Sequence, residues 1–102
     1  MYKYGVDLVF AGHVHNQERT LPVFNSSLVA SPDPSMPYNN ARAPVYIVSG
    51  NPGNAEETNY FGRGFDPWTA WRSYHFGYSH LVVEDAGGYL ELCCRQLNCF
   101  KN

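Results

Sequence analysis

The chain has 102 residues with a formal net charge of -2, and 44% of its residues are hydrophobic and 16% aromatic. That length allows one domain at most, and the apolar content excludes a disordered segment because it is sufficient to build a packed core. The seven basic residues are scattered and no apolar stretch is long enough for a bilayer span or a signal peptide, so we expect a soluble chain without nucleic-acid or membrane partners.

Four segments are predicted to be strands, and long loops separate them. Residues 6–11, VDLVFA, form a short β-rich run between two glycines, which is typical of a buried strand. Residues 45–50, VYIVSG, follow a proline and predict a second buried strand. Residues 77–85 and 89–95 are joined by Ala-Gly-Gly and together predict a hairpin.

The segments between the strands carry turn signals. Residues 21–44 hold five prolines among many Asn, Ser and Ala residues, which predicts a long irregular excursion without a helix. Residues 51–68 form a turn-rich loop, and residues 69–74 are expected to hold one short turn. Strands that are buried on both faces normally need covering helices or a second sheet, and this chain offers neither. We therefore expect part of the domain to be missing from the chain.

Three cysteines lie near the end of the sequence, at Cys93, Cys94 and Cys99. Adjacent residues on a strand point to opposite faces, so Cys93 and Cys94 are poorly placed to bind one ion together. Either of them could bridge to Cys99 across a turn. An odd number of cysteines leaves one thiol over and leaves the redox compartment open.

Two histidines one residue apart, His13 and His15, follow the first predicted strand and Gly12. Extended residues two apart face the same side with Cα atoms about 6.6 Å apart, so both imidazoles can enter one pocket. Two-metal hydrolytic sites hold their ions about 3.5–4 Å apart, which suits one imidazole for each ion. Open sheets place ligand sites beyond their strand ends, and a glycine helps the chain to turn there. Two unrelated surface histidines are the alternative interpretation.

The residues after this pair suit a supporting role. Asn16, Glu18 and Arg19 can hold the loop by hydrogen bonds and a charge pair, because ligating histidines need a partner for their second N–H. Asn25 begins an Asn-Ser-Ser sequence that matches the N-glycosylation acceptor pattern, which matters only if the protein is secreted.

Other polar and aromatic residues are expected to have structural roles. Glu56 and Glu57 follow one another in a loop, where carboxylates are normally solvated. His75 and His80 flank a predicted strand and are expected at the surface. Trp68 and Trp71 are expected to pack against the sheet, since their indoles supply a large apolar area.

Three blocks of the sequence resemble one enzyme family. Residues 4–25, YGVDLVFAGHVHNQERTLPVFN, resemble the G-H-x-H block of the metallophosphoesterases in the form found in purple acid phosphatases. Residues 43–57 resemble that family's strand and G-x-x-G-N-x-E loop, and residues 71–85 resemble its F-G-Y-S-x-L strand. The blocks occur in the family's order and the resemblance covers about residues 4–95, although Gln17 stands where tyrosine is usual.

The resemblance implies phosphomonoester hydrolysis at a dinuclear centre of Fe(III) with Zn(II), Mn(II) or Fe(II). His13 would bind the divalent ion and His15 the ferric ion. The implied fold class is α/β, the C-terminal part of a β-sandwich flanked by helices, of which this chain holds mostly strands and long loops. The family is largely secreted, lysosomal or vacuolar.

The family's other ligand blocks, of the D-x-G, G-D-x-x-Y, G-N-H-[DE] and V-x-x-H types, are absent from this sequence. No catalytic residue is therefore expected here, and residues 1–102 are expected to be an incomplete domain that is not a catalyst by itself. Its natural partner would be the missing N-terminal part of the same domain.

Two other interpretations stay open beside this one. The chain could be a non-catalytic β-rich interaction module whose histidines are incidental or hold one structural ion. It could also be an inactive truncated product that does not fold alone. Tight binding of two metal ions would favour the phosphatase origin. A cooperative thermal unfolding transition that chelators do not change would favour the module. A broad or absent thermal transition would favour the truncated product.

Overall fold

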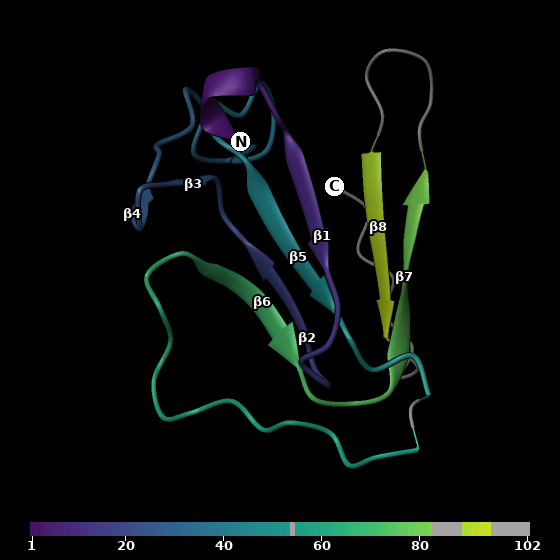
Figure 1. Cartoon of the computed structure of the whole chain (residues 1–102). Coiled ribbons are helices and arrows are strands. Elements are labelled where there is room, and N and C mark those ends of the chain that lie inside the picture. Colours follow the sequence, from purple (N-terminus) through teal and green to yellow (C-terminus); the bar gives the residue numbers. More distant parts are fainter. Residues whose placement is uncertain (54, 83–88, 95–102) are drawn as a thin grey trace.

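The computed structural model describes residues 1–53, 55–82 and 89–94, and these form strands and loops around one mixed sheet (Figure 1). The sheet has the strand order β1 (Leu8–Ala11), β5 (Val45–Ser49), β2 (Gln17–Thr20), β6 (Thr69–Ser73). The remaining described elements are a short 3-10 helix and two hairpins: η1 (Tyr2–Tyr4), β3 (Val23–Phe24) with β4 (Ser27–Leu28), and β7 (Gly77–Val82) with β8 (Tyr89–Cys94). Within the described ranges, no helix has the length and hydropathy needed to span a membrane.

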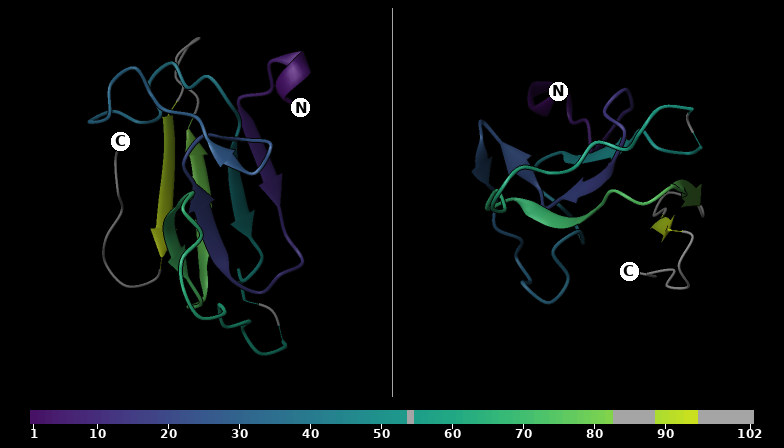
Figure 2. Two further views of the ribbon diagram at one scale, coloured as in Figure 1. Left: turned by 90° about the vertical axis from the view of Figure 1, so that its left-hand side faces the viewer. Right: turned by 90° about the horizontal axis from the view of Figure 1, so that it is seen from below.

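Several loop connections meet at one edge of the sheet, namely the end at which β1, β5 and β6 finish and β2 begins. β1 runs parallel to β5, and β2 runs antiparallel to both β5 and β6. Gln17 at the start of β2 therefore pairs with Ser49 at the end of β5 and with Ser73 at the end of β6. Figures 1 and 2 show the long loop after β5 running past this edge before it returns to β6. The turn between β1 and β2 lies at the same edge.

The predicted strands are present, and two further strands of the main sheet were missed. β1, β5, β7 and β8 fall within the segments predicted from apolar patterns. β2 was not predicted, and β6 lies where only a short turn was expected, so that expectation was wrong. Their sequences, QERT and TAWRS, lack a regular apolar alternation, and pairing within the sheet determines their conformation.

The fold class is confirmed only in its coarser part. The described residues are almost all strands and loops and match the expectation of a strand-rich chain. Flanking α-helices of the implied sandwich are not found among the described residues. The long excursion over residues 21–44 is irregular as expected, except for the short β3–β4 hairpin. Asn25 and Ser26 form the turn of that hairpin, and their φ angles of 49° and 57° are typical of a tight two-residue hairpin turn.

The core is small and is centred on β5. Val45 and Ile47 are buried, and Leu8, Tyr38 and Trp71 pack against them, which confirms the packing role expected for Trp71. Trp68 is half-buried and is not part of this cluster.

β1 departs from the expected burial. The sequence predicted a strand buried on both faces, but β1 lies at the end of the strand order and Phe10 is 46% exposed. The expectation is therefore wrong for the side chain of Phe10. The physical reason is that, among the described elements, β1 pairs only with β5, so its outer edge has no partner strand.

Asn51 connects the main sheet to the β7–β8 hairpin. It is fully buried, its Nδ2 donates a hydrogen bond to the His75 carbonyl, and its own carbonyl accepts one from the Gly77 N–H at 3.2 Å. Ser79 adds a hydroxyl bond to Ser49 at 2.9 Å. These contacts fix the first residues of β7 against the end of β5.

Replacing Asn51 with alanine is expected to destabilise the chain by about 1–3 kcal/mol, because the hydrogen bond from this buried side chain to the His75 carbonyl is lost. The shift in the midpoint of urea unfolding measures this effect. Asn39→Ala is the matched control: Asn39 is exposed and should change stability by less than about 0.5 kcal/mol. Equal shifts for the two variants would show that the Asn51 side chain does not join the two sheets.

Candidate functional site

His13 and His15 are the central residues of two consecutive three-residue turns. The N–H of Val14 donates to the Gly12 carbonyl at 2.9 Å, and the N–H of Asn16 donates to the Val14 carbonyl at 2.8 Å. His13 has a φ of 72°, the value of the rare and strained form of this turn. Strain of this kind persists only where the surrounding structure holds it, and it clusters at functional sites.

Gly50, directly after β5, makes room for the histidine turn. Its N–H donates to the Asn16 carbonyl at 3.1 Å, and a Cβ added to it would lie 1.9 Å from the carbonyl oxygen of Val14. The sequence suggested that Gly12 allows the sharp turn. At Gly12, however, a Cβ would meet nothing closer than 3.9 Å, and the left-handed φ falls on His13. The glycine that this turn requires is therefore Gly50.

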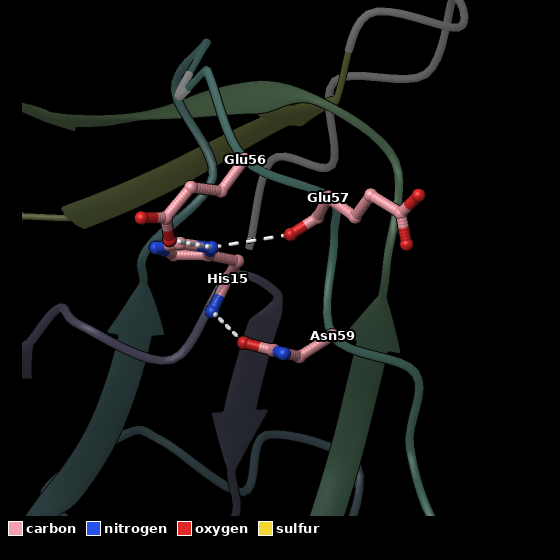
Figure 3. A network of polar contacts seen from close by, with 4 residues as sticks. All are labelled: His15, Glu56, Glu57 and Asn59. Carbon is pink, nitrogen blue, oxygen red and sulfur yellow. Dashed lines mark hydrogen bonds and ion pairs between the residues drawn. The ribbon is translucent and has the colours of Figure 1, made fainter.

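His15 is held by the loop that follows β5 (Figure 3). Its backbone N–H donates to Asn59 Oδ1 at 2.7 Å, and its carbonyl accepts from the Asn59 N–H at 2.8 Å. The imidazole Nδ1 lies 3.1 Å from the carbonyl oxygen of Glu57 and 3.5 Å from Oε2 of Glu56. The Glu56 side chain is 81% exposed, as expected for a loop carboxylate, yet it reaches the ring.

The contacts of His15 favour one tautomer. A carbonyl oxygen can only accept a hydrogen bond, so the contact with Glu57 requires the proton on Nδ1, which places the lone pair on Nε2. Metal-ligating histidines commonly donate their other ring N–H to a backbone carbonyl or a carboxylate. In this tautomer Nε2 is the ring nitrogen with the chemistry to bind a metal ion. His13 follows Gly12 in the same turn, and its side chain is exposed.

The donor set tests whether an iron or zinc centre fits this turn. Imidazole nitrogen is a suitable ligand for both metals. Among the described residues, no group of three or more His, Cys, Asp or Glu residues could hold a metal ion together. Catalytic zinc sites use three protein ligands, so two imidazoles fit as part of a donor set and not as the whole.

The residues expected to support the histidines lie in different places. Asn16 is buried and its Nδ2 donates to the carbonyl of Asn59 at 3.4 Å, in the loop that holds His15. Glu18 Oε1 accepts a hydrogen bond from the Thr69 hydroxyl at 2.6 Å, and the Arg19 guanidinium lies over a tyrosine ring. Adjacent residues of a strand face opposite sides, so the expected charge pair between Glu18 and Arg19 does not form.

The other expectations are met in part. His75 and His80 are exposed, as expected. The possible disulfide with Cys99 lies outside the described residues. Sequence reasoning did not find Asn59, because it binds His15 across 44 positions and no local pattern marks such a contact. Gly50 had a signal, since it ends a predicted strand before an Asn-Pro-Gly turn.

Comparisons with known sequences agree on one family. The model of the family described as "Iron/zinc purple acid phosphatase-like protein C" matches residues 43–87. Acid phosphatase type 7 of Homo sapiens is 41% identical over 82 residues, which are 80% of this chain and 18% of that protein. Acid phosphatase A of Cryphonectria parasitica is 40% identical over 85 residues, 83% of this chain and 16% of that protein.

A third relative, Probable inactive purple acid phosphatase 24 of Arabidopsis thaliana, is 34% identical over 88 residues, 86% of this chain and 14% of that protein. The chain thus spans 18% or less of the length of these three relatives. A solved purple acid phosphatase from yellow lupin (Lupinus luteus) seeds matches with a TM-score of 0.63 and 24% identity, over 78% of this chain and 14% of that one. This likeness shows that the chain resembles part of that structure in its fold.

Proposed function

We propose that this chain, which carries a purple acid phosphatase-like C-terminal region, supplies His13 and His15 as ligands to the dinuclear metal centre of a phosphomonoesterase. The observation that carries the proposal is the contact of the His15 Nδ1 with the Glu57 carbonyl at 3.1 Å. Such a contact fixes the tautomer and the orientation of a ligating imidazole. The description of the matching family names iron and zinc, and imidazole suits both.

The role of this chain's residues is to hold and orient the two imidazoles. A bound pair of metal ions, Fe(III) with Zn(II), Mn(II) or Fe(II), would supply positive charge that attracts the phosphate oxygens. It would also lower the pKa of a bound water molecule. Asn59 fixes the backbone of His15, and Gly50 leaves the space that the turn occupies. Asn16 supports the same loop through its contact with Asn59. We propose that the carboxylates of the centre come from the rest of the protein.

The partner that completes the domain would cover the outer side of β1. Phe10 at the end of this strand and Val14 in the histidine turn are each 46% exposed. An exposed apolar edge strand is unusual in a finished domain, because it invites pairing with another chain. We propose that the N-terminal part of the same domain occupies this edge in the whole protein, so that residues 1–102 are its C-terminal portion.

A secreted, lysosomal or vacuolar location belongs to the same proposal. Asn25 lies at the exposed tip of the β3–β4 hairpin, where a glycosyl transferase can reach it. Mass spectrometry of the protein isolated from its natural source would detect a glycan on the Asn25 peptide. An unmodified peptide would remove the support that this residue gives to the location.

A non-catalytic module is the second candidate function. The described residues provide only the two imidazoles of a metal site, and one relative bears the name Probable inactive purple acid phosphatase 24. A module of this kind would keep the strands and the histidine turn without hydrolysing an ester.

A chimera separates the two candidates. The region of human acid phosphatase type 7 that matches this chain over 82 residues is replaced with the corresponding residues of this chain. We expect the chimera to hydrolyse nitrophenyl phosphate, with the unmodified human protein as the reference. A folded chimera that binds metal and does not hydrolyse the ester would support the non-catalytic candidate. A folded chimera that loses its metal would contradict the proposed ligand role.

A further inference from the structure

A hollow rich in aromatic side chains lies beside the histidine turn. It has a volume of about 330 Å³, which is within the range of small-molecule sites. Its main lining residues define what is called here the aromatic hollow: Tyr60, Phe61, Phe65, Arg72, Tyr74 and His75. None of these residues has a part in the proposed metal centre.

A positive charge is fixed within the aromatic hollow. The guanidinium carbon of Arg72 lies 3.8 Å from the ring centroid of Phe65 and 4.7 Å from that of Phe61. Among the described residues, no carboxylate lies within ion-pair distance of Arg72. Glu18 and Asp66 line a neighbouring hollow that Arg72 also borders, so they weaken its charge without pairing with it. Ring stacking uses the faces of a guanidinium and leaves its N–H edge for an anion.

The rings in the aromatic hollow form a surface suited to a planar ligand. Tyr60 and Tyr74 have ring centroids 4.8 Å apart, and Tyr74 and His75 have centroids 4.7 Å apart. Tyr60 is 74% exposed and Phe65 is 72% exposed. Exposed aromatic side chains that gather in a hollow next to a cation favour a planar anionic ligand, because stacking and charge attraction act on it together.

The position of the aromatic hollow relates it to the histidine turn. Tyr60 directly follows Asn59, which binds both peptide groups of His15, and consecutive Cα atoms are about 3.8 Å apart. On the other side, Ser73 also borders the hollow and pairs with Gln17, two residues after His15. The hollow therefore lies near the end of the sheet that carries the histidine turn.

We propose that the aromatic hollow binds the aromatic group of an aryl phosphomonoester. Arg72 attracts the negative charge of this ligand, and the rings of Tyr60 and Tyr74 stack on its planar group. Naming a phosphate ester rests on the proposed function, but binding in the hollow requires no metal ion. The chain itself can therefore test the inference without activity.

The test is an NMR titration of the isotope-labelled 102-residue chain, without metal, with naphthyl phosphate and with cyclohexyl phosphate. The two ligands carry the same phosphate, and only one has an aromatic ring. We expect naphthyl phosphate to bind about tenfold more tightly than cyclohexyl phosphate, because ring stacking adds to the free energy gained by burying apolar surface. The amide signals of residues 60–65 and 72–75 should shift.

Two pairs of variants locate the binding. Tyr60→Ala should weaken naphthyl phosphate binding about tenfold, whereas Tyr4→Ala, at a tyrosine that is 80% exposed elsewhere, should leave it unchanged. Arg72→Gln should weaken binding of both phosphates, and Arg42→Gln at an exposed arginine should not. Because Tyr60 is highly exposed, its variant keeps the test valid if Arg72→Gln unfolds.

Equal affinity for the two ligands, or an equal loss in Tyr4→Ala and Tyr60→Ala, would overturn the inference. A zinc titration of the same sample keeps this result separate from the proposed function. If zinc shifts the His15 signals and naphthyl phosphate shows no preference, only the aromatic hollow is rejected. If naphthyl phosphate is preferred and zinc does not reach His13 or His15, the ligand role is rejected and the aromatic hollow remains.

Discussion

Gly50→Ala is expected to disorder the histidine turn and to destabilise the chain by about 3 kcal/mol, the upper part of the usual range for added atoms in a tightly packed place. The new Cβ would lie 1.9 Å from the carbonyl oxygen of Val14 and 2.7 Å from its carbonyl carbon. These are backbone atoms, so no flexible side chain can move aside. The turn itself must shift, and it contains His13 and His15. Urea unfolding followed by tryptophan fluorescence measures the loss.

Two other glycines provide matched controls for this prediction. Gly62→Ala adds a Cβ that meets nothing within 4 Å, and its effect should be below about 1 kcal/mol in either direction. Gly12→Ala lies in the turn itself but makes only an ordinary contact at 3.9 Å, so it should be tolerated far better than Gly50→Ala. An unfolding midpoint of Gly50→Ala equal to that of the unmodified chain would contradict the described packing of the turn on β5.

The strands that could be predicted are those whose own side chains explain their burial. β1 and β5 carry runs of Val, Leu, Ile, Phe and Tyr that favour a strand in any context. β2 could not be predicted, because its polar residues find their partners only in the folded sheet. The Thr20 hydroxyl accepts a hydrogen bond from the Tyr46 N–H at 3.0 Å, and Glu18 accepts one from Thr69. Both partners are distant in the sequence.

As with the strands, only part of the candidate site could be predicted from the sequence. His13 and His15 could be placed beyond the end of a strand from their position alone, and the structure places them in one turn at that edge. The group that orients the His15 ring could not be predicted, since it is the backbone carbonyl of Glu57, which any residue type would supply. The left-handed φ of His13 was also unexpected, because non-glycine residues rarely adopt it and no sequence pattern marked this position. The metal roles of the two histidines stay predictions.

The second large effect is expected for zinc binding. His15→Ala, and likewise His13→Ala, should weaken the binding of Zn²⁺ to the chain by at least about 100-fold. Loss of residues that only orient a ligand already costs about 10–100-fold, and here a ligand itself is removed. Among the described residues no third donor joins the pair, so each single variant leaves one imidazole. Calorimetry on the purified chain measures the affinity.

The control for this comparison is His80→Ala, at an exposed histidine on β7. It should leave the zinc affinity unchanged. Asn59→Ala should give an intermediate loss of about 10–100-fold, because the His15 ring remains but its backbone is no longer fixed. A similar loss in His80→Ala, or unchanged binding in the double variant of His13 and His15, would place the zinc elsewhere on the chain. The graded series therefore distinguishes a ligand pair built by the fold from two histidines that happen to be neighbours.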